Sequence, residues 1–143
     1  MIEINYALNT IFFLISGAMV MWMAAGFTAL EAGSVRTKNV TEILTKNVAL
    51  FSVASIAFLL CGYGVMYGWN EPDTHSMYAD FFFQMVFVAT AMSVVSGAVA
   101  ERKKLWSFLI FAALFSAVIY PLEGAWTWGG GFLSGLGFVD FAG

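Results

Sequence analysis

The chain has 143 residues, of which 61% are hydrophobic and 10% are charged, with a formal net charge of -3 at pH 7 and a mean hydropathy of +0.84. A water-soluble domain carries about 25% charged residues, so this composition excludes a soluble globular protein and predicts a chain surrounded by lipid. The single cysteine, Cys61, excludes an internal disulfide and lies in an apolar stretch, where we expect it to be buried.

Four apolar runs follow one another along the chain, each near the ~20 residues that a helix needs to cross a bilayer. They cover residues 6–30, 48–69, 81–100 and 105–122. The runs are continuous and do not alternate, and lipid offers no partner to an unpaired backbone group, so helices are favoured over strands. The sequence therefore predicts an all-α, polytopic membrane protein with four transmembrane helices.

The six basic residues fall in two of the connections between these runs. The first connection carries Arg36, Lys38 and Lys46, and the second carries Arg102, Lys103 and Lys104. Cytoplasmic loops of membrane proteins carry an excess of Lys and Arg, so both connections are predicted to be cytoplasmic. The first run follows Glu3 and no basic residue, which is not typical of a signal peptide. We therefore expect an integral protein of the cell membrane with the N-terminus outside.

Residues 123–140 form a segment rich in Gly and Trp, with too many glycines for a fifth spanning helix. The residues alone favour an aromatic belt on an outer loop, because glycine permits tight turns and tryptophan is favoured at the membrane interface. Asp140 lies just before the end of the chain and is typical of the N-cap of a helix that would begin there.

Four stretches together resemble the ammonium transporter (Amt/Rh) family. They are residues 25–39 (AGFTALEAG, then VRTKN), Phe83-Gln84 with Phe87, residues 97–102 (GAVAER), and residues 120–143 from Tyr120-Pro121 through Trp128-Gly129-Gly130-Gly131 to the end. The last stretch is the most specific, whereas GAVAER or WGGG alone would be weak. The resemblance covers nearly the whole chain, residues 1–143, and implies the N-terminal portion of that fold, namely its first four helices and the start of the fifth.

The resemblance implies a transporter that recruits ammonium at an outer aromatic vestibule and passes ammonia, with or without a separately moved proton, into a hydrophobic pore. The position matching Trp128 contributes to a cation–π recruitment site. Phe87 matches one of two stacked phenylalanines that gate the pore, and Asp140 matches an aspartate that shapes the vestibule. Without the surrounding match, Phe87 would be interpreted as an ordinary core or lipid-facing phenylalanine, since the chain has fifteen.

Polar residues near the helix ends have simpler explanations. Gln84 needs a partner inside its helix bundle, and we expect a hydrogen bond between helices. Glu31 and Glu101 lie beside Arg36 and Arg102, so loop salt bridges are expected, and neither glutamate is a convincing proton carrier.

The chain also departs from the family, which has about eleven helices in two inverted halves with the pore between them. The pair of pore histidines and the second gate phenylalanine have no counterpart here. The only histidine, His75, falls in an outer loop, where a solvated side chain is expected and no metal site is predicted. Ala125 stands where many relatives have a histidine, which we take as subclass variation. We therefore expect a fragment of a transporter.

Two other function classes have four-helix members of this size. A small proton-coupled exporter would need an ionisable residue well inside a span, and none is predicted. A non-conducting membrane sensor or binding subunit derived from an ammonium transporter stays open. No enzyme, cofactor or nucleic-acid partner is expected, because no catalytic constellation or unexplained basic patch is found. The family implies a homotrimer and a small cytoplasmic regulatory signalling protein as possible partners.

Overall fold

The computed structural model describes residues 2–141 and is helical, with no strand in that range. It contains four helices long and apolar enough to cross a membrane, as predicted. In chain order the elements are α1 (Ile2–Ser34), the 3₁₀ turn η1 (Thr37–Asn39), α2 (Val40–Ala57), the π-helical turn η2 (Phe58–Gly62), α3 (Tyr63–Met66), α4 (Met77–Ala98), α5 (Leu105–Leu114), the π-helical turn η3 (Phe115–Ile119), α6 (Tyr120–Thr127) and α7 (Phe132–Gly135). The second span is thus α2 with η2 and α3, and the fourth is α5 with η3 and α6.

The helices extend beyond the apolar runs of the sequence. The second span already begins at Val40, so that Lys46 lies within a helix and not in a loop. The fourth span continues to Thr127, and α7 follows after a short turn, inside the segment expected to be a loop. A helix forms its own backbone hydrogen bonds. It can therefore extend beyond the apolar residues if its polar side chains also have hydrogen-bond partners.

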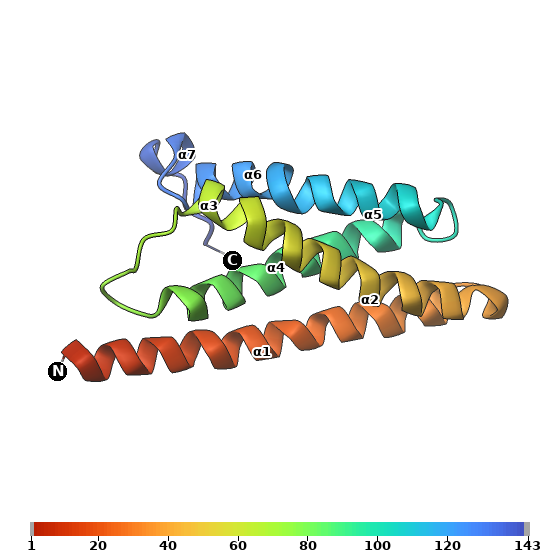
Figure 1. Cartoon of the computed structure of the whole chain (residues 1–143), viewed down its shortest axis with the longest axis horizontal. Helices are drawn as coiled ribbons and strands as arrows, with labels where there is room; N and C mark the ends of the chain where they lie inside the picture. The colour runs from red at the N-terminus through yellow and green to blue at the C-terminus, as the bar shows by residue number, and fades with distance from the viewer. Residues whose placement is uncertain (1, 142–143) are drawn as a thin grey trace.

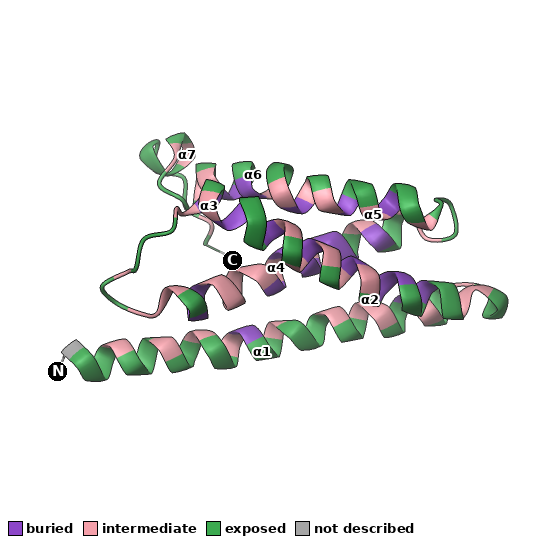
Figure 2. Cartoon of the chain, viewed as in Figure 1, coloured by how far each residue is buried: buried purple, intermediate pink, exposed green. Residues whose placement is uncertain are grey.

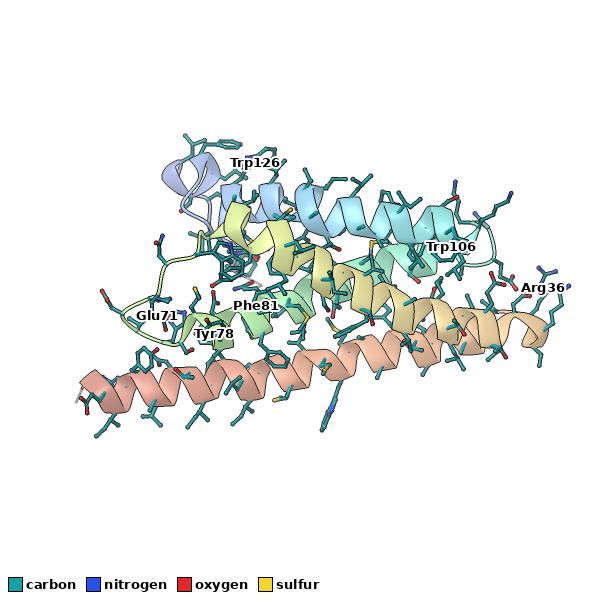
Figure 3. All side chains as sticks on the ribbon, in the orientation of Figure 1. Arg36, Glu71, Tyr78, Phe81, Trp106 and Trp126 are labelled. Carbon is teal, nitrogen blue, oxygen red and sulfur yellow. The ribbon has the colours of Figure 1, made fainter. Side chains whose placement is uncertain are left out.

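The four spans run back and forth between two ends of an elongated bundle (Figure 1). One end, called the basic end, holds the α1–α2 and α4–α5 connections with Arg36, Lys38 and residues 102–104. The other, called the acidic end, holds the start of α1, the α3–α4 connection and residues 128–141. Arg36 and Glu71 mark the two ends in Figure 3.

Burial is concentrated between the second, third and fourth spans, whereas α1 is mostly exposed and lies along α4 (Figure 2). Two clusters of buried side chains hold these spans together. One consists of Leu50, Met92, Phe108 and Ala112, and the other of Phe58, Tyr63, Met66 and Val88. In lipid, close packing and not exclusion of water is the main force between helices. Cys61, expected to be buried, is exposed, because it lies on the outward side of its span.

The π-helical turns η2 and η3 lie against each other between the second and fourth spans. A Cβ atom at Gly62 would lie 2.7 Å from the carbonyl oxygen of Ser116 and 2.9 Å from Cγ of Pro121. Only glycine permits this approach of the two backbones. Single π-helical turns inside α-helices occur frequently at functional sites. Here η2 lies just before α3 and η3 just before α6, the helices that reach the acidic end.

Candidate functional site

A hollow of ≈ 270 Å³ lies at the acidic end and is called here the aromatic pocket. It is lined by Tyr67, Phe83, Gln84, Phe87, Tyr120, Trp128 and Asp140. The second, third and fourth spans and the final segment of the chain all contribute. The structure therefore brings the three predicted site residues, Phe87, Trp128 and Asp140, to one cavity.

Trp128 is placed by the end of α6 and by the glycines that follow it. Its backbone N–H donates to the carbonyl oxygen of Gly124 at 2.7 Å, which closes the helix at this residue. A Cβ atom at Gly129 would collide with the carbonyl oxygen of Met66, and Gly130 has a φ of +75°. Because only glycine tolerates both conditions well, the chain can turn sharply beside α3 directly after Trp128. The indole remains half-exposed, at 49%.

One wall of the pocket is built from phenylalanines one helical turn apart on α4. The rings of Phe83 and Phe87 meet edge to face, with centroids 4.9 Å apart. Phe13 of α1 adds a second edge-to-face contact to Phe83 at 5.1 Å. Such pairs fix ring orientation, and aromatic faces attract cations through their quadrupoles. The pocket is thus lined largely by aromatic side chains, the kind of side chain that attracts small cations.

Behind this wall, a buried carboxylate joins α4 to the second span. Asp80 lies in the first turn of α4 and is only 8% exposed. Its Oδ2 accepts a hydrogen bond from the hydroxyl of Tyr63 at 2.8 Å, and its Oδ1 accepts one from Nε2 of Gln84 at 3.3 Å. Gln84 was expected to bond between helices, but this contact lies within α4, because residues four apart share one helix face. Gln84 also lines the aromatic pocket.

Tyr67 lines the pocket just beyond the end of α3. Its pKa is raised above the ordinary value by burial and, to a smaller extent, by the carboxylate of Asp80 and by Tyr120. The side chain therefore keeps its proton at neutral pH and presents a neutral hydroxyl. A neutral hydroxyl can both donate and accept hydrogen bonds.

Asp140 reaches the pocket from the last described turn of the chain and is partly buried. The helix that it was predicted to cap would include residues 142 and 143, which lie outside the described residues. Its predicted capping role therefore stays a prediction. Its place at the pocket edge puts an acidic side chain beside the aromatic faces.

The basic end contains a second polar cluster, called here the Glu31 cluster, whose side chains are buried against one another. Nζ of Lys46 lies 2.9 Å from Oε1 of Glu31, and the two side chains are only 10% and 6% exposed. Asn47 donates to Oε2 of Glu31 at 2.6 Å, and Ser96 donates to Oε1 at 3.0 Å. The expected loop salt bridge of Glu31 is therefore wrong. Its partners lie on α2 and α4, where Lys46 compensates the buried charge.

Glu101 pairs with Arg36, not with the neighbouring Arg102. Its Oε1 accepts hydrogen bonds from Nε of Arg36 at 3.2 Å and from Nδ2 of Asn39 at 2.5 Å. Glu101 has a φ of 60°, an uncommon conformation for a residue with a side chain. Hydrogen bonds from Asn39 and Arg36 lower the pKa of its carboxyl group. The pair ties the two connections of the basic end together.

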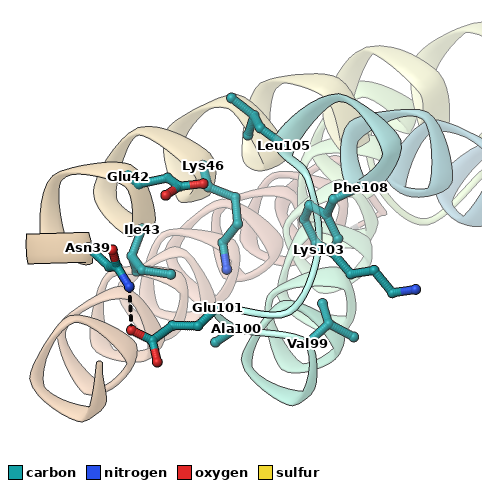
Figure 4. A pocket seen from close by; sticks show the side chains of 10 residues that line it. All are labelled: Asn39, Glu42, Ile43, Lys46, Val99, Ala100, Glu101, Lys103, Leu105 and Phe108. Carbon is teal, nitrogen blue, oxygen red and sulfur yellow. Dashed lines mark hydrogen bonds between the residues drawn. The ribbon is translucent and has the colours of Figure 1, made fainter. Parts of the chain in front are cut away.

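A hollow of ≈ 210 Å³ is lined by both Glu101 and Lys46 (Figure 4). Lys46 points into it from α2, and the ring of Phe108 lies 5.5 Å from its Nζ. Both acidic and basic side chains line this space, including Glu42 and Lys103. Its lining therefore offers no single charge to a ligand.

His75 was expected to be solvated, but it is partly buried against α1. Its ring lies 4.5 Å from that of Phe13, and its Nδ1 is 2.8 Å from Oγ1 of Thr74. These contacts attach the α3–α4 connection to α1.

Sequence reasoning missed Asp80, Tyr63 and Tyr67 at the acidic end. It placed Asp80 in the outer loop, although the spacing of Asp80 and Gln84 is a signal of one shared helix face. The tyrosines carry no comparable signal, because their partners are separated from them by a whole connection. Tyr63 and Asp80 lie 17 residues apart in the sequence.

Comparisons with known proteins agree with this architecture. The model of the Ammonium Transporter Family matches residues 11–143. The chain is 43% identical to ammonium transporter Amt2 of Archaeoglobus fulgidus, over 91% of this chain and 33% of that protein. It is 38% identical to a putative ammonium transporter of Synechocystis sp., over 99% of this chain and 36% of that protein. A solved structure named "Sensor Amt Protein" superposes with a TM-score of 0.93 at 34% identity, over 100% of this chain and 41% of that one.

The chain spans about a third of the length of these two curated relatives. The match nevertheless extends over nearly all of its own residues, both in sequence and in the arrangement of the four spans. The chain belongs to the ammonium transporter family.

Proposed function

We propose that this chain takes part in moving ammonium or ammonia across a membrane, and that it recruits the cation at the aromatic pocket. The observation that carries the proposal is the meeting of Phe87, Trp128 and Asp140 at one hollow of ≈ 270 Å³. Transfer of a bare cation into hydrocarbon is costly, so a recruiting site needs counter-charge or π-faces. This pocket supplies both, because aromatic side chains line it and the acidic side chain of Asp140 lies at its edge.

Each residue has a distinct role in the proposal. Trp128 attracts the cation through its indole face, and Phe87 closes the route below the pocket. Asp140 shapes the entrance. The basic end faces the cytoplasm of the cell membrane, because Lys and Arg are enriched in cytoplasmic loops, and the N-terminus lies outside. A homotrimer and a cytoplasmic signalling partner are the assemblies that the family suggests. Transport, and no chemical reaction, fits the relatives named as transporters.

The test is uptake of radiolabelled methylammonium into proteoliposomes that contain the purified chain. Trp128→Leu is compared with Trp126→Leu, a matched control from the same helix end. The two indoles are similarly exposed, at 49% and 46%, but Trp126 packs on Phe132 and does not line the pocket. Uptake lost in Trp128→Leu and kept in Trp126→Leu supports transport by this chain.

A second candidate, a membrane subunit that binds ammonium without conducting it, is favoured by one observation. The solved structure that covers 100% of this chain is named a sensor. Equilibrium binding of methylammonium to the chain in lipid nanodiscs separates the two candidates. Binding that depends on Trp128 without uptake supports the sensor. Absence of both uptake and Trp128-dependent binding overturns the recruitment site itself.

A further inference from the structure

The polar side of the aromatic pocket depends on one amide. Gln84 lines the pocket from α4, between Phe83 and the turn that carries Phe87. A glutamine side chain has a donating NH₂ group and an accepting carbonyl oxygen, and either can face a cavity. Only the carbonyl oxygen can accept a hydrogen bond from an ammonium ion. The orientation of this amide therefore decides whether the pocket attracts or repels such a ligand.

The buried carboxylate of Asp80 determines that orientation. A carboxylate only accepts hydrogen bonds, so the group of Gln84 that faces it must be the donating NH₂. The distance from Nε2 of Gln84 to Oδ1 of Asp80 is 3.3 Å. The other carboxylate oxygen, Oδ2, accepts the hydroxyl of Tyr63 at 2.8 Å, which holds the carboxylate in place. With Nε2 turned to Asp80, Oε1 of Gln84 is left for another donor.

The hydrogen bond from Nε2 to Asp80 is the one that this amide makes within residues 2–141. A partly buried carbonyl without a donor is unfavourable in an apolar environment and becomes favourable when a ligand donates to it. The other groups around the pocket are aromatic rings, tyrosine hydroxyls and the carboxylate of Asp140. Aromatic faces attract any small cation, whereas a carbonyl oxygen distinguishes cations that carry N–H donors.

We propose that Asp80 is a positioning residue that holds the Gln84 amide with its carbonyl oxygen toward the aromatic pocket, where this oxygen accepts a hydrogen bond from ammonium or a primary alkylammonium ion. The proposal rests on the proposed function, because it assigns specificity to the same pocket. Trp128 supplies affinity for cations in general, and Gln84 supplies selectivity for cations with N–H groups.

The experiment measures equilibrium binding of two probes to the chain in lipid nanodiscs. Methylammonium carries N–H donors, and tetramethylammonium has the same charge but none. Gln84→Leu is expected to weaken methylammonium binding by about tenfold, the effect of losing one hydrogen bond to a charged group. Binding of tetramethylammonium is expected to stay within about twofold, since the aromatic faces remain. A purely structural role would weaken both probes together.

Two changes at Asp80 test its part in the arrangement. Asp80→Ala releases the amide and is expected to reduce the preference for methylammonium, whereas Asp80→Asn keeps an accepting oxygen and is expected to preserve it. Tyr78→Phe alters an exposed tyrosine on the same helix that does not line the pocket, and it serves as the matched control with unchanged preference. Circular dichroism of each variant checks folding, and Gln84→Leu alone suffices for the selectivity test if Asp80→Ala does not fold.

The outcomes separate this inference from the proposed function. If the unaltered chain binds neither probe, the recruitment site fails and the role of Asp80 fails with it. If both probes bind and Trp128→Leu weakens both, but Gln84→Leu leaves the preference unchanged, only the role of Gln84 and Asp80 is overturned. If Asp80→Asn loses the preference as Asp80→Ala does, the charge of Asp80 and not its hold on the amide is responsible.

Discussion

The two ends of the bundle use polar side chains in opposite ways. At the basic end, Glu31 accepts hydrogen bonds from Lys46, Asn47 and Ser96, so that its carboxylate is fully occupied by protein groups. At the acidic end, aromatic rings surround a hollow of ≈ 270 Å³ and the polar groups stand at its margin. At the basic end, all partners of the buried charge belong to the protein, so the charge holds helices together. At the acidic end, the cavity among the aromatic rings has room for a ligand. Polarity inside a membrane bundle is therefore not by itself a sign of a binding site.

The largest effect is expected from breaking the Glu31 cluster. Glu31→Leu leaves the ammonium group of Lys46 buried without its counter-charge, and we expect a loss of about 3–5 kcal/mol in the free energy of unfolding. Unfolding of the purified chain in detergent micelles, followed by circular dichroism, measures it. The double change Glu31→Leu with Lys46→Leu removes both charges and should cost less than the single change. A double variant as unstable as the single one would contradict a compensated ion pair.

A smaller effect is expected where the two π-helical turns meet. Gly62→Ala places a Cβ atom 2.7 Å from the carbonyl oxygen of Ser116, and it also collides with the ring of Phe58. We expect a loss of about 1–3 kcal/mol, as for other overpacked sites. Gly26→Ala is the matched control, because nothing lies within 4 Å of its added Cβ atom. Equal melting temperatures of the two variants would argue against close packing at Gly62.

The smallest effect is expected at the exposed Glu101–Arg36 pair, where it depends on pH. The pKa of Glu101 is lowered below its ordinary value of 4.5 by hydrogen bonds from Asn39 and Arg36. A lowered pKa means that the folded state favours the charged carboxylate, so the stabilisation is present above pH 4.5 and disappears as the pH falls through the lowered value. We expect Glu101→Gln to melt slightly below the unaltered chain at pH 7, and the difference to shrink as the pH falls below 4.5. A difference that does not change with pH would contradict a role for the charge of Glu101.

The sequence predicted the four spans well because hydropathy is a local property of each run. The outline of the pocket was predicted only through resemblance, since nothing local distinguishes Phe87 from fourteen other phenylalanines. The bounds of the apolar runs also placed Lys46 and Asp80 in loops, and this was wrong, because both are buried within helices. Hydropathy records that a charge lies near a helix end but not whether another helix covers it.

Long sequence separation explains the remaining errors. Ser96 reaches Glu31 from 65 residues away, and the same separation divides Arg36 from Glu101. These residues meet because α1 packs along α4. The apolar pattern of one helix does not show which other helix it packs against. The π-helical turns are equally hidden, because their residues are as apolar as the helices around them.

The paired π-helical turns also govern the direction in which the ends of the spans face. A π-helical turn accommodates one extra residue in a helix, and one residue corresponds to a rotation of about 100° around the helix axis. Everything beyond η3, including Trp128, is thus rotated relative to α5 by that single insertion. Deleting one residue of η3 would restore the α-helical register and turn the indole of Trp128 by about 100° relative to Phe87. The position of the indole in the pocket is therefore set by helix phase, and a family member could lose the pocket by a one-residue deletion without changing any of its lining residues.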